Sequence, residues 1–179
     1  MRTWTLACSA CDARQPGDQP ATVCPACGQP WLVEYPALTV LPKEIGGRWD
    51  MWRYSPMLPL KTGEPPVSLG EGGTPLIEAQ TVADAVRVAR VQVKDEGLNP
   101  TGSFKARGMS AAVTRALALG VRGLVVPTAG NAGAALAAYA AAARIPARVY
   151  APRTTPENIL QTIRIFGAEL ILVDGHIGD

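Results

Sequence analysis

Strand-like and helix-like apolar patterns alternate along the second half of the chain, and this alternation most constrains the fold. The predicted strands are residues 87–94, 123–127, 147–151 and 169–173, and the predicted helices are 104–119, 131–144 and 155–166. Strands that alternate with helices form parallel sheets with right-handed crossovers. We therefore predict an α/β fold over residues 74–179, with a parallel sheet and helices on both of its faces.

The predicted helices also carry end signals. Gly120 can end the first helix, because glycine readily adopts the left-handed conformation found after helix C-termini. Thr155 is expected to be the N-cap of the third helix, with Pro156 in its first turn. The apolar face of that helix is expected to consist of Ile159, Ile163 and Phe166. Because a covering helix normally follows the last strand of such a sheet, we expect the sequence to be the N-terminal portion of a longer protein.

The first half of the chain is rich in proline. Of the 16 prolines, 11 lie at or before Pro75, and proline disrupts helix interiors. We therefore predict a small cysteine module over residues 1–35 and a proline-rich, irregular arm over residues 36–73. The arm carries three aromatic residues, Trp49, Trp52 and Tyr54, which we expect to pack onto the main body.

All four cysteines belong to two C-x-x-C pairs, Cys8 with Cys11 and Cys24 with Cys27. Two such pairs supply the four thiolates that a tetrahedral structural zinc ion prefers. The sequence therefore predicts a zinc ribbon, in which the metal supplies much of the folding energy of so small a module. A metal-free remnant, tetrahedral iron and a redox pair are the alternatives.

Composition excludes several classes of protein. Hydrophobic residues make up 47% of the chain, which excludes intrinsic disorder, and the net charge of +2 gives no reason to expect a nucleic-acid partner. With His176 as the only histidine, no metal site can use two histidines of one chain. We find no apolar run of about 20 residues and no signal peptide, so we expect a cytoplasmic protein without a membrane segment.

Two loops carry the candidate chemistry. Lys105 follows a turn-rich stretch, residues 94–104, and lies at a predicted helix N-terminus, where the helix dipole disfavours its ammonium form. A free amine of this kind can attack a carbonyl, although a solvated lysine is the alternative. Residues 127–133 open the next helix and can form an anion site, or simply a turn. A P-loop is disfavoured, because Lys105 is displaced by two residues from the required position.

Three ordered motifs carry a resemblance. They read LGEGGTPL over residues 69–76, KDEGLNPTGSFKARG over 94–108 and TAGNAG over 128–133. Together they resemble threonine synthases, which belong to the tryptophan synthase β-like, fold type II family of pyridoxal-phosphate enzymes. A four-cysteine module followed by a proline-rich arm also precedes the catalytic part of many threonine synthases.

The resemblance implies roles for individual residues. Lys105 would form the aldimine with pyridoxal phosphate, Phe104 would lie against its ring, and Asn131 would hydrogen-bond its phenolic oxygen. The substrate carboxylate would be held by Thr128, Ala129, Gly130 and Asn131. The residues that would bind substrate phosphate or buttress the loop are Thr101 and Ser103.

The implied reaction belongs to threonine biosynthesis and converts O-phosphohomoserine and water to threonine and phosphate. The partner would thus be a small amino-acid phosphate, and a homodimer stays open. Ala106 stands where many threonine synthases have aspartate, so threonine or serine dehydratase and cysteate synthase are alternatives. Nothing before Asp179 matches the family's phosphate cradle, so we expect no turnover from this chain alone. A non-enzymatic zinc-ribbon remnant that binds a partner is the alternative from another class.

Overall fold

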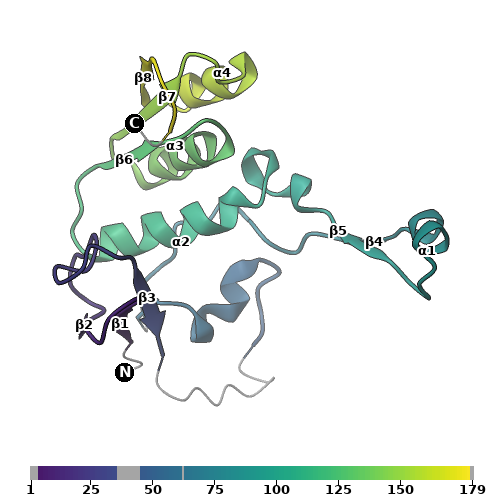
Figure 1. The fold of residues 1–179 in the computed structure, drawn as a ribbon, viewed down its shortest axis with the longest axis horizontal. Helices are drawn as coiled ribbons and strands as arrows, with labels where there is room; N and C mark the ends of the chain where they lie inside the picture. Colours follow the sequence, from purple (N-terminus) through teal and green to yellow (C-terminus); the bar gives the residue numbers. More distant parts are fainter. Residues whose placement is uncertain (1–3, 36–44, 62, 178–179) are drawn as a thin grey trace.

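The N-terminal module is a small antiparallel sheet in a computed structural model that describes residues 4–35, 45–61 and 63–177 (Figure 1). Its strands are β1 (Thr5–Cys8), β2 (Arg14–Pro16) and β3 (Trp31–Glu34), in the order β2-β1-β3. The Trp4 indole packs over Gly17 and donates a 3.1 Å hydrogen bond to its carbonyl. A Cβ atom at Gly17 would lie 2.1 Å from the indole, so this packing requires glycine.

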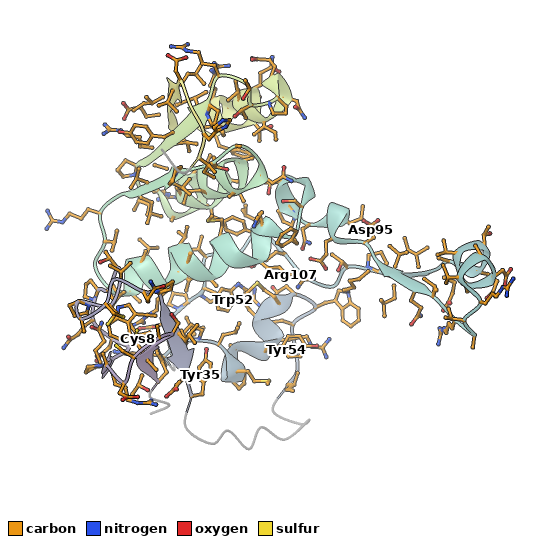
Figure 2. The ribbon with its side chains drawn as sticks, viewed as in Figure 1. Cys8, Tyr35, Trp52, Tyr54, Asp95 and Arg107 are labelled. Atoms are coloured by element: carbon orange, nitrogen blue, oxygen red, sulfur yellow. The ribbon has the colours of Figure 1, made fainter. Side chains whose placement is uncertain are left out.

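The arm carries a short 3₁₀ helix, η2 (Met51–Met57). The Trp52 side chain is buried between this helix and the main body, as we predicted (Figure 2). The prediction is wrong for Trp49 and Tyr54, which are 77% and 46% exposed. Their rings lie 5.4 and 5.6 Å from the Arg53 guanidinium, so cation–π contact replaces burial.

A two-stranded ribbon extends from the body, where the sequence predicted a long strand over residues 87–94 (Figure 1). Strand β4 (Leu76–Glu78) pairs antiparallel with β5 (Gln92–Lys94), and helix α1 (Gln80–Val86) lies between them in the chain. The prediction is wrong before Gln92, because Arg87 ends α1 in the left-handed conformation with φ of 58°.

The α/β region follows the predicted alternation closely. Its elements are η3 (Glu96–Leu98), η4 (Pro100–Gly102), α2 (Lys105–Ala118), β6 (Leu124–Pro127), α3 (Asn131–Ala143), β7 (Ala147–Pro152), α4 (Glu157–Ile165) and β8 (Glu169–Val173). The last three strands form a parallel sheet in the order β6-β7-β8. From residue 104 onward each predicted helix and strand lies within two residues of its observed bounds, and Gly120 follows α2 with φ of 74°.

Helix α4 differs from its prediction in two details. Pro156 is the N-cap, and the buried Thr155 hydroxyl has no hydrogen-bond partner among the described residues, so Thr155 is not the cap. Phe166 is 40% exposed because it follows the last helical residue, and Leu160 joins Ile163 on the buried face instead.

Helix α3 is the centre of the fold. Its residues 133–140 are all buried, because α2 packs against one side of the helix and the sheet against the other. The contact with α2 includes Val113 and Tyr139, whereas the sheet side includes Val149. Small alanine side chains let all three layers approach closely. At Gly133 the approach is so close that a Cβ atom would lie 2.5 Å from the Thr128 methyl group.

The described helices cover one face of the parallel sheet. Ala147, Val149 and Ala151 face the helices and are buried, whereas Val125 and Arg148 on the other face are exposed. Helices on both faces therefore stay a prediction. Within the described ranges, no helix combines the length and the hydropathy that a bilayer crossing requires.

Candidate functional site

Lys105 is the first residue of α2, which confirms its predicted place at a helix N-terminus. Its backbone N–H donates a 3.3 Å hydrogen bond to the Ser103 hydroxyl, so Ser103 buttresses this turn. The Lys105 Nζ lies 4.5 Å from the centroid of the Phe104 ring, which is 57% exposed. The structure thus brings the amine and the ring together at a partly open helix end.

The loop before Lys105 is anchored by the Glu96 carboxylate. It accepts hydrogen bonds from Arg107 Nε at 2.7 Å and Nη2 at 2.8 Å, from the Thr74 hydroxyl at 2.7 Å and from Asn99 Nδ2 at 2.8 Å. The Arg107 hydrogen bonds are the main cause that lowers the pKa of Glu96 to about 2, helped by Thr74 and Asn99. This ionised anchor fixes both sides of the Lys105 turn.

Sequence reasoning gave Glu96 and Arg107 no role, although both lie in the motif 94–108. In the sequence, an acidic and a basic residue 11 positions apart across a turn-rich stretch only weakly predict an ion pair.

Thr101 and Gly102 are the bend of this loop. Both have left-handed backbone conformations, with φ of 62° and 69°. Such a conformation is uncommon for threonine and is held here by the surrounding structure. The Thr101 hydroxyl is buried and has no hydrogen-bond partner in the described structure. This buried hydroxyl could therefore form a further hydrogen bond, and it lies three residues before Phe104.

The asparagine turn lies between β6 and α3. The buried Thr128 hydroxyl accepts a 3.0 Å hydrogen bond from the Gly130 N–H, which closes the turn. Ala129 and Asn131 are exposed, and Asn131 is the first residue of α3. The first N–H groups of a helix have no partner within the helix, so the predicted anion site at this helix start stays a prediction.

The two turns belong to neighbouring elements. Helix α2 packs along α3, and η4, which lies just before Lys105, also packs against α3. No hydrogen bond joins Lys105 to Asn131 within the described ranges. The structure therefore places the two predicted turns on adjacent helices and leaves the roles of their side chains as predictions.

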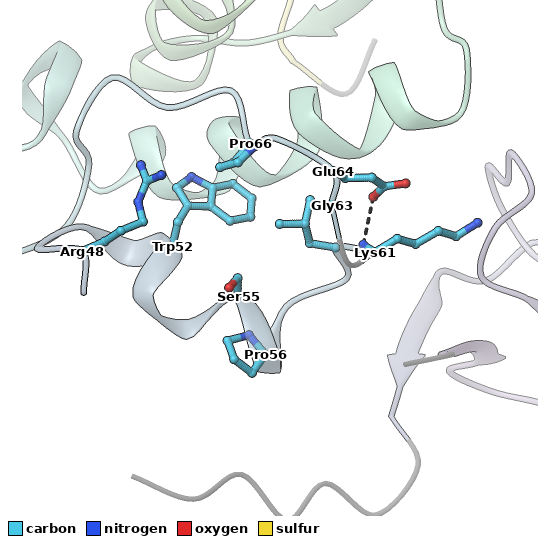
Figure 3. Close-up of a pocket in the computed structure, with 9 residues that line it drawn as sticks. Arg48, Trp52, Ser55, Pro56, Lys61, Gly63, Glu64 and Pro66 are labelled. Atoms are coloured by element: carbon cyan, nitrogen blue, oxygen red, sulfur yellow. Dashed lines mark hydrogen bonds between the residues drawn. The ribbon is translucent and has the colours of Figure 1, made fainter. Parts of the chain in front are cut away.

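A separate cavity of about 420 Å³ lies within the arm (Figure 3). It is lined by Arg48, Trp52, Ser55, Pro56, Leu60, Lys61, Gly63, Glu64 and Pro66. The Glu64 carboxylate closes one side by accepting a 2.9 Å hydrogen bond from the Lys61 N–H. None of the residues predicted to bind cofactor or substrate lines it.

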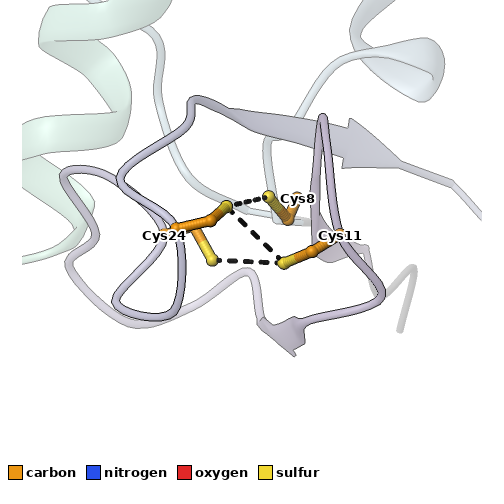
Figure 4. Close-up of side chains that lie close together, drawn as sticks. Cys8, Cys11 and Cys24 are labelled. Carbon is orange, nitrogen blue, oxygen red and sulfur yellow. Dashed lines mark hydrogen bonds between the residues drawn. The ribbon is translucent and has the colours of Figure 1, made fainter.

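The four cysteines converge (Figure 4). Their sulfur atoms all lie within 4.8 Å of one another, with separations of 3.4 Å for Cys8–Cys27, 3.7 Å for Cys11–Cys24 and 3.6 Å for Cys11–Cys27. A tetrahedral zinc ion with Zn–S bonds of about 2.3 Å needs sulfur atoms roughly 3.8 Å apart. The Ala10 N–H, with further help from Cys27, lowers the pKa of the Cys8 thiol to about 6. The donor set therefore fits a zinc ion.

The cysteine module is attached to the far end of α2 from Lys105. The Arg115 guanidinium lies 4.8 Å from the Trp4 ring and donates a 3.2 Å hydrogen bond to the Gly17 carbonyl. It also lies 3.7 Å from the Glu64 carboxylate of the arm. One side chain of α2 thus contacts both the module and the arm.

Comparison with known proteins decides the family. A family model described as "Pyridoxal-phosphate dependent enzyme" matches residues 67–179, which include both candidate turns. The chain belongs to this family. This pyridoxal-phosphate family chain is 33% identical to threonine synthase of Methanosarcina acetivorans, over 97% of its own length and 44% of the relative's. It is 41% identical to threonine synthase of Synechocystis sp., over 80% of its length and 38% of the relative's. It therefore spans less than half the length of these relatives.

Solved structures of the family share its fold. Diaminopropionate ammonia lyase from Escherichia coli superimposes with a TM-score of 0.59 at 25% identity, over 63% of this chain and 33% of that one. O-ureido-L-serine synthase gives a TM-score of 0.54 at 34% identity, over 59% of this chain and 34% of that one. The predicted resemblance to fold type II enzymes with a parallel α/β sheet is confirmed.

Proposed function

We propose that this chain carries the reactive lysine and the carboxylate-binding turn of a pyridoxal-phosphate lyase of the threonine synthase type. One observation supports the proposal above the others. The Lys105 amine forms no ion pair within the described ranges and lies at the start of a helix packed against α3, the helix that Asn131 opens. An unpaired lysine at such a position is suited to covalent chemistry with a carbonyl.

The residues of the two turns would have different roles. Pyridoxal phosphate supplies an electron sink when it is bound. Lys105 would hold the cofactor and then move a proton at the substrate α-carbon, while Phe104 limits access of water to one side of the amine. The turn of residues 128–131 would bind the substrate carboxylate through the Ala129 and Asn131 N–H groups, because the Thr128 and Gly130 N–H groups already donate to the Tyr150 carbonyl and the Thr128 hydroxyl. The Asn131 amide would donate to the cofactor's phenolic oxygen. The Thr101 hydroxyl would donate one hydrogen bond to a phosphate oxygen.

Reductive trapping tests the cofactor part of the proposal. The chain is incubated with pyridoxal phosphate, treated with borohydride and mapped by peptide mass spectrometry. We expect a pyridoxyl group on Lys105, with far less on Lys61 and Lys94, and no labelled peptide at this position in Lys105→Ala. Equal labelling of all four lysines, Lys43 included, would refute the proposal and favour a non-enzymatic α/β protein.

Product analysis tests the substrate part. We expect threonine and phosphate from O-phosphohomoserine when the chain is assayed with the rest of the fold that its relatives have. A dehydratase is the second candidate, because Ala106 is fully buried and brings no carboxylate beside Lys105. Release of 2-oxobutanoate from threonine would support the dehydratase, and consumption of O-phosphoserine would support a cysteate synthase.

We also propose that the four cysteines bind one structural zinc ion. The sulfur separations support it, and four thiolates leave no open position for catalysis. A cytoplasmic location would keep these thiols reduced and available to metal. Metal analysis of purified protein should give one zinc per chain, falling to none in Cys11→Ser with Cys24→Ser. Iron in place of zinc, or a disulfide between two of the thiols, would overturn the assignment.

A further inference from the structure

Glu71 is a fully buried carboxylate whose hydrogen-bond partners are all neutral groups. Its Oε1 atom lies 2.7 Å from the Trp52 indole nitrogen and 2.5 Å from the Ser110 hydroxyl. Its Oε2 atom lies 2.6 Å from the Tyr139 hydroxyl and 2.9 Å from the Leu69 N–H. Each partner comes from a different segment: η2, α2, α3 and the loop that carries Glu71 itself.

The loop around Glu71 also contacts the turn before Lys105. The Gly72 N–H donates a 3.0 Å hydrogen bond to the Asn99 side chain, which in turn bonds to Glu96. The Glu71 carbonyl accepts a 2.8 Å hydrogen bond from the Met51 N–H. A Cβ atom at Gly72 would lie 2.4 Å from that nitrogen, so the loop and the start of η2 are in close backbone contact here.

A buried carboxylate is costly, and an apolar side chain of similar size would often stabilise a core better. What a carboxylate offers is direction, because its two oxygen atoms accept hydrogen bonds at defined angles. Ser110 lies five residues after Lys105 on α2, and Tyr139 lies eight residues after Asn131 on α3. The two hydroxyls therefore fix how these helices sit relative to each other.

We propose that Glu71 is a positioning residue: its carboxylate sets the relative placement of α2 and α3 and hence of Lys105 and Asn131. The inference rests on the proposed role of Lys105, but the placement of the helices can be measured without it. Burial and the hydrogen bond to Glu71 raise the pKa of Tyr139, so this phenol stays a donor to the carboxylate at any ordinary pH.

Three variants of the chain test the proposal. Glu71→Leu keeps the volume and removes both acceptor oxygens, so the Tyr139 hydroxyl and the Leu69 N–H lose their partner. Trp52 keeps its 2.9 Å hydrogen bond to the Ser110 oxygen, and Ser110 keeps its 2.7 Å bond to the Val67 carbonyl. Glu71→Gln keeps an acceptor for Tyr139 and Leu69, and its amide can donate to the Ser110 oxygen. The matched control is Thr114→Val on the same helix, because the buried Thr114 hydroxyl accepts a 2.8 Å bond from Val67 N–H far from both turns.

Two measurements are made on each variant: amide hydrogen exchange of the first turns of α2 and α3, and the rate of borohydride trapping at Lys105. We expect Glu71→Leu to increase exchange in both turns and to slow trapping by about 10-fold or more, since small misplacements of reacting groups have large rate effects. Glu71→Gln should restore most of both signals, and Thr114→Val should change neither turn.

The outcomes separate the two proposals. Local exchange in Glu71→Leu equal to that in Thr114→Val would overturn the positioning role. If wild-type Lys105 is not labelled, the proposed function fails while the exchange data still decide the role of Glu71. Should Glu71→Leu not fold, Tyr139→Phe takes its place: increased exchange at the start of α3 supports the proposal, and unchanged exchange contradicts it.

Discussion

Replacing Glu96 by glutamine should destabilise the loop that carries Lys105 and should change the response of the protein to acid. The carboxylate accepts four hydrogen bonds, two from Arg107 and one each from Thr74 and Asn99. A glutamine amide has one acceptor oxygen, so its NH₂ group must face at least one of these donors. The Arg107 charge also loses its partner.

The size of the effect follows from exposure. Arg107 holds the pKa of Glu96 at about 2, against an ordinary value of 4.5, and a difference of that size corresponds to about 3 kcal/mol in a fully protected site. The Glu96 side chain is 26% exposed and Arg107 is 31% exposed, so solvent screens part of the interaction. We therefore expect Glu96→Gln to lower the free energy of unfolding by about 1–2 kcal/mol at pH 7.

Urea unfolding across a pH series checks the prediction. The folded-state pKa of Glu96 is lowered, so its stabilisation is complete above pH 4.5 and is lost as the pH falls toward 2. The difference between wild type and Glu96→Gln should shrink over that window. Glu169→Gln is the matched control, because the Arg148–Glu169 pair has the same 2.7 Å separation but is 50% and 57% exposed.

The control variant, Glu169→Gln, should lower the free energy of unfolding by less than about 0.5 kcal/mol. Equal losses in the two variants, or a difference between wild type and Glu96→Gln that does not change between pH 7 and pH 2, would refute the reasoning from burial.

Three further outcomes can be measured. Gly72→Ala should destabilise the protein by roughly 2–4 kcal/mol in urea unfolding, because φ is 108° and a Cβ atom would overlap the Met51 backbone. Gly108→Ala, whose Cβ atom would meet open space on α2, should stabilise the protein by about 0.5–1 kcal/mol. Arg115→Met should weaken the contact with Trp4 by about 1–2 kcal/mol, seen as faster amide exchange in β1 with α3 unchanged. Removing zinc with a chelator should abolish protection of β1–β3 but leave α2 and α3 folded; intact β1–β3 after proven metal loss would contradict the ligand assignment.

The helices and strands after residue 104 could be predicted from sequence because their signals are local. Apolar periodicity defines each element, and Gly120 and Gly167 follow two of the helices with positive φ. The ribbon at β4 and β5 could not be predicted in the same way. Residues 87–94 include a helix end, a turn and a three-residue strand, so the apolar alternation over this stretch does not come from one continuous strand.

The residues of the candidate site differ in the same way in whether the sequence could predict them. Lys105 and Asn131 could be predicted as candidates because each belongs to a contiguous motif at the start of a helix. The Glu71 network was missed, since its carboxylate meets Tyr139 68 residues further along the chain. Sequence patterns report neighbours along a helix or strand, whereas a buried hydrogen-bond network depends on how helices meet in space.

Because Gly133 has no side chain, few other residues could replace it during the evolution of this site. The α3 backbone rests on the Thr128 methyl group there, with Val149 and Ile163 beneath it. Any larger residue would lift the helix start off the strand and carry Asn131 with it. Substitution at position 133 is therefore limited by close packing in the core rather than by contact with a ligand. A change in this packing would also move the turn residues that are proposed to bind substrate.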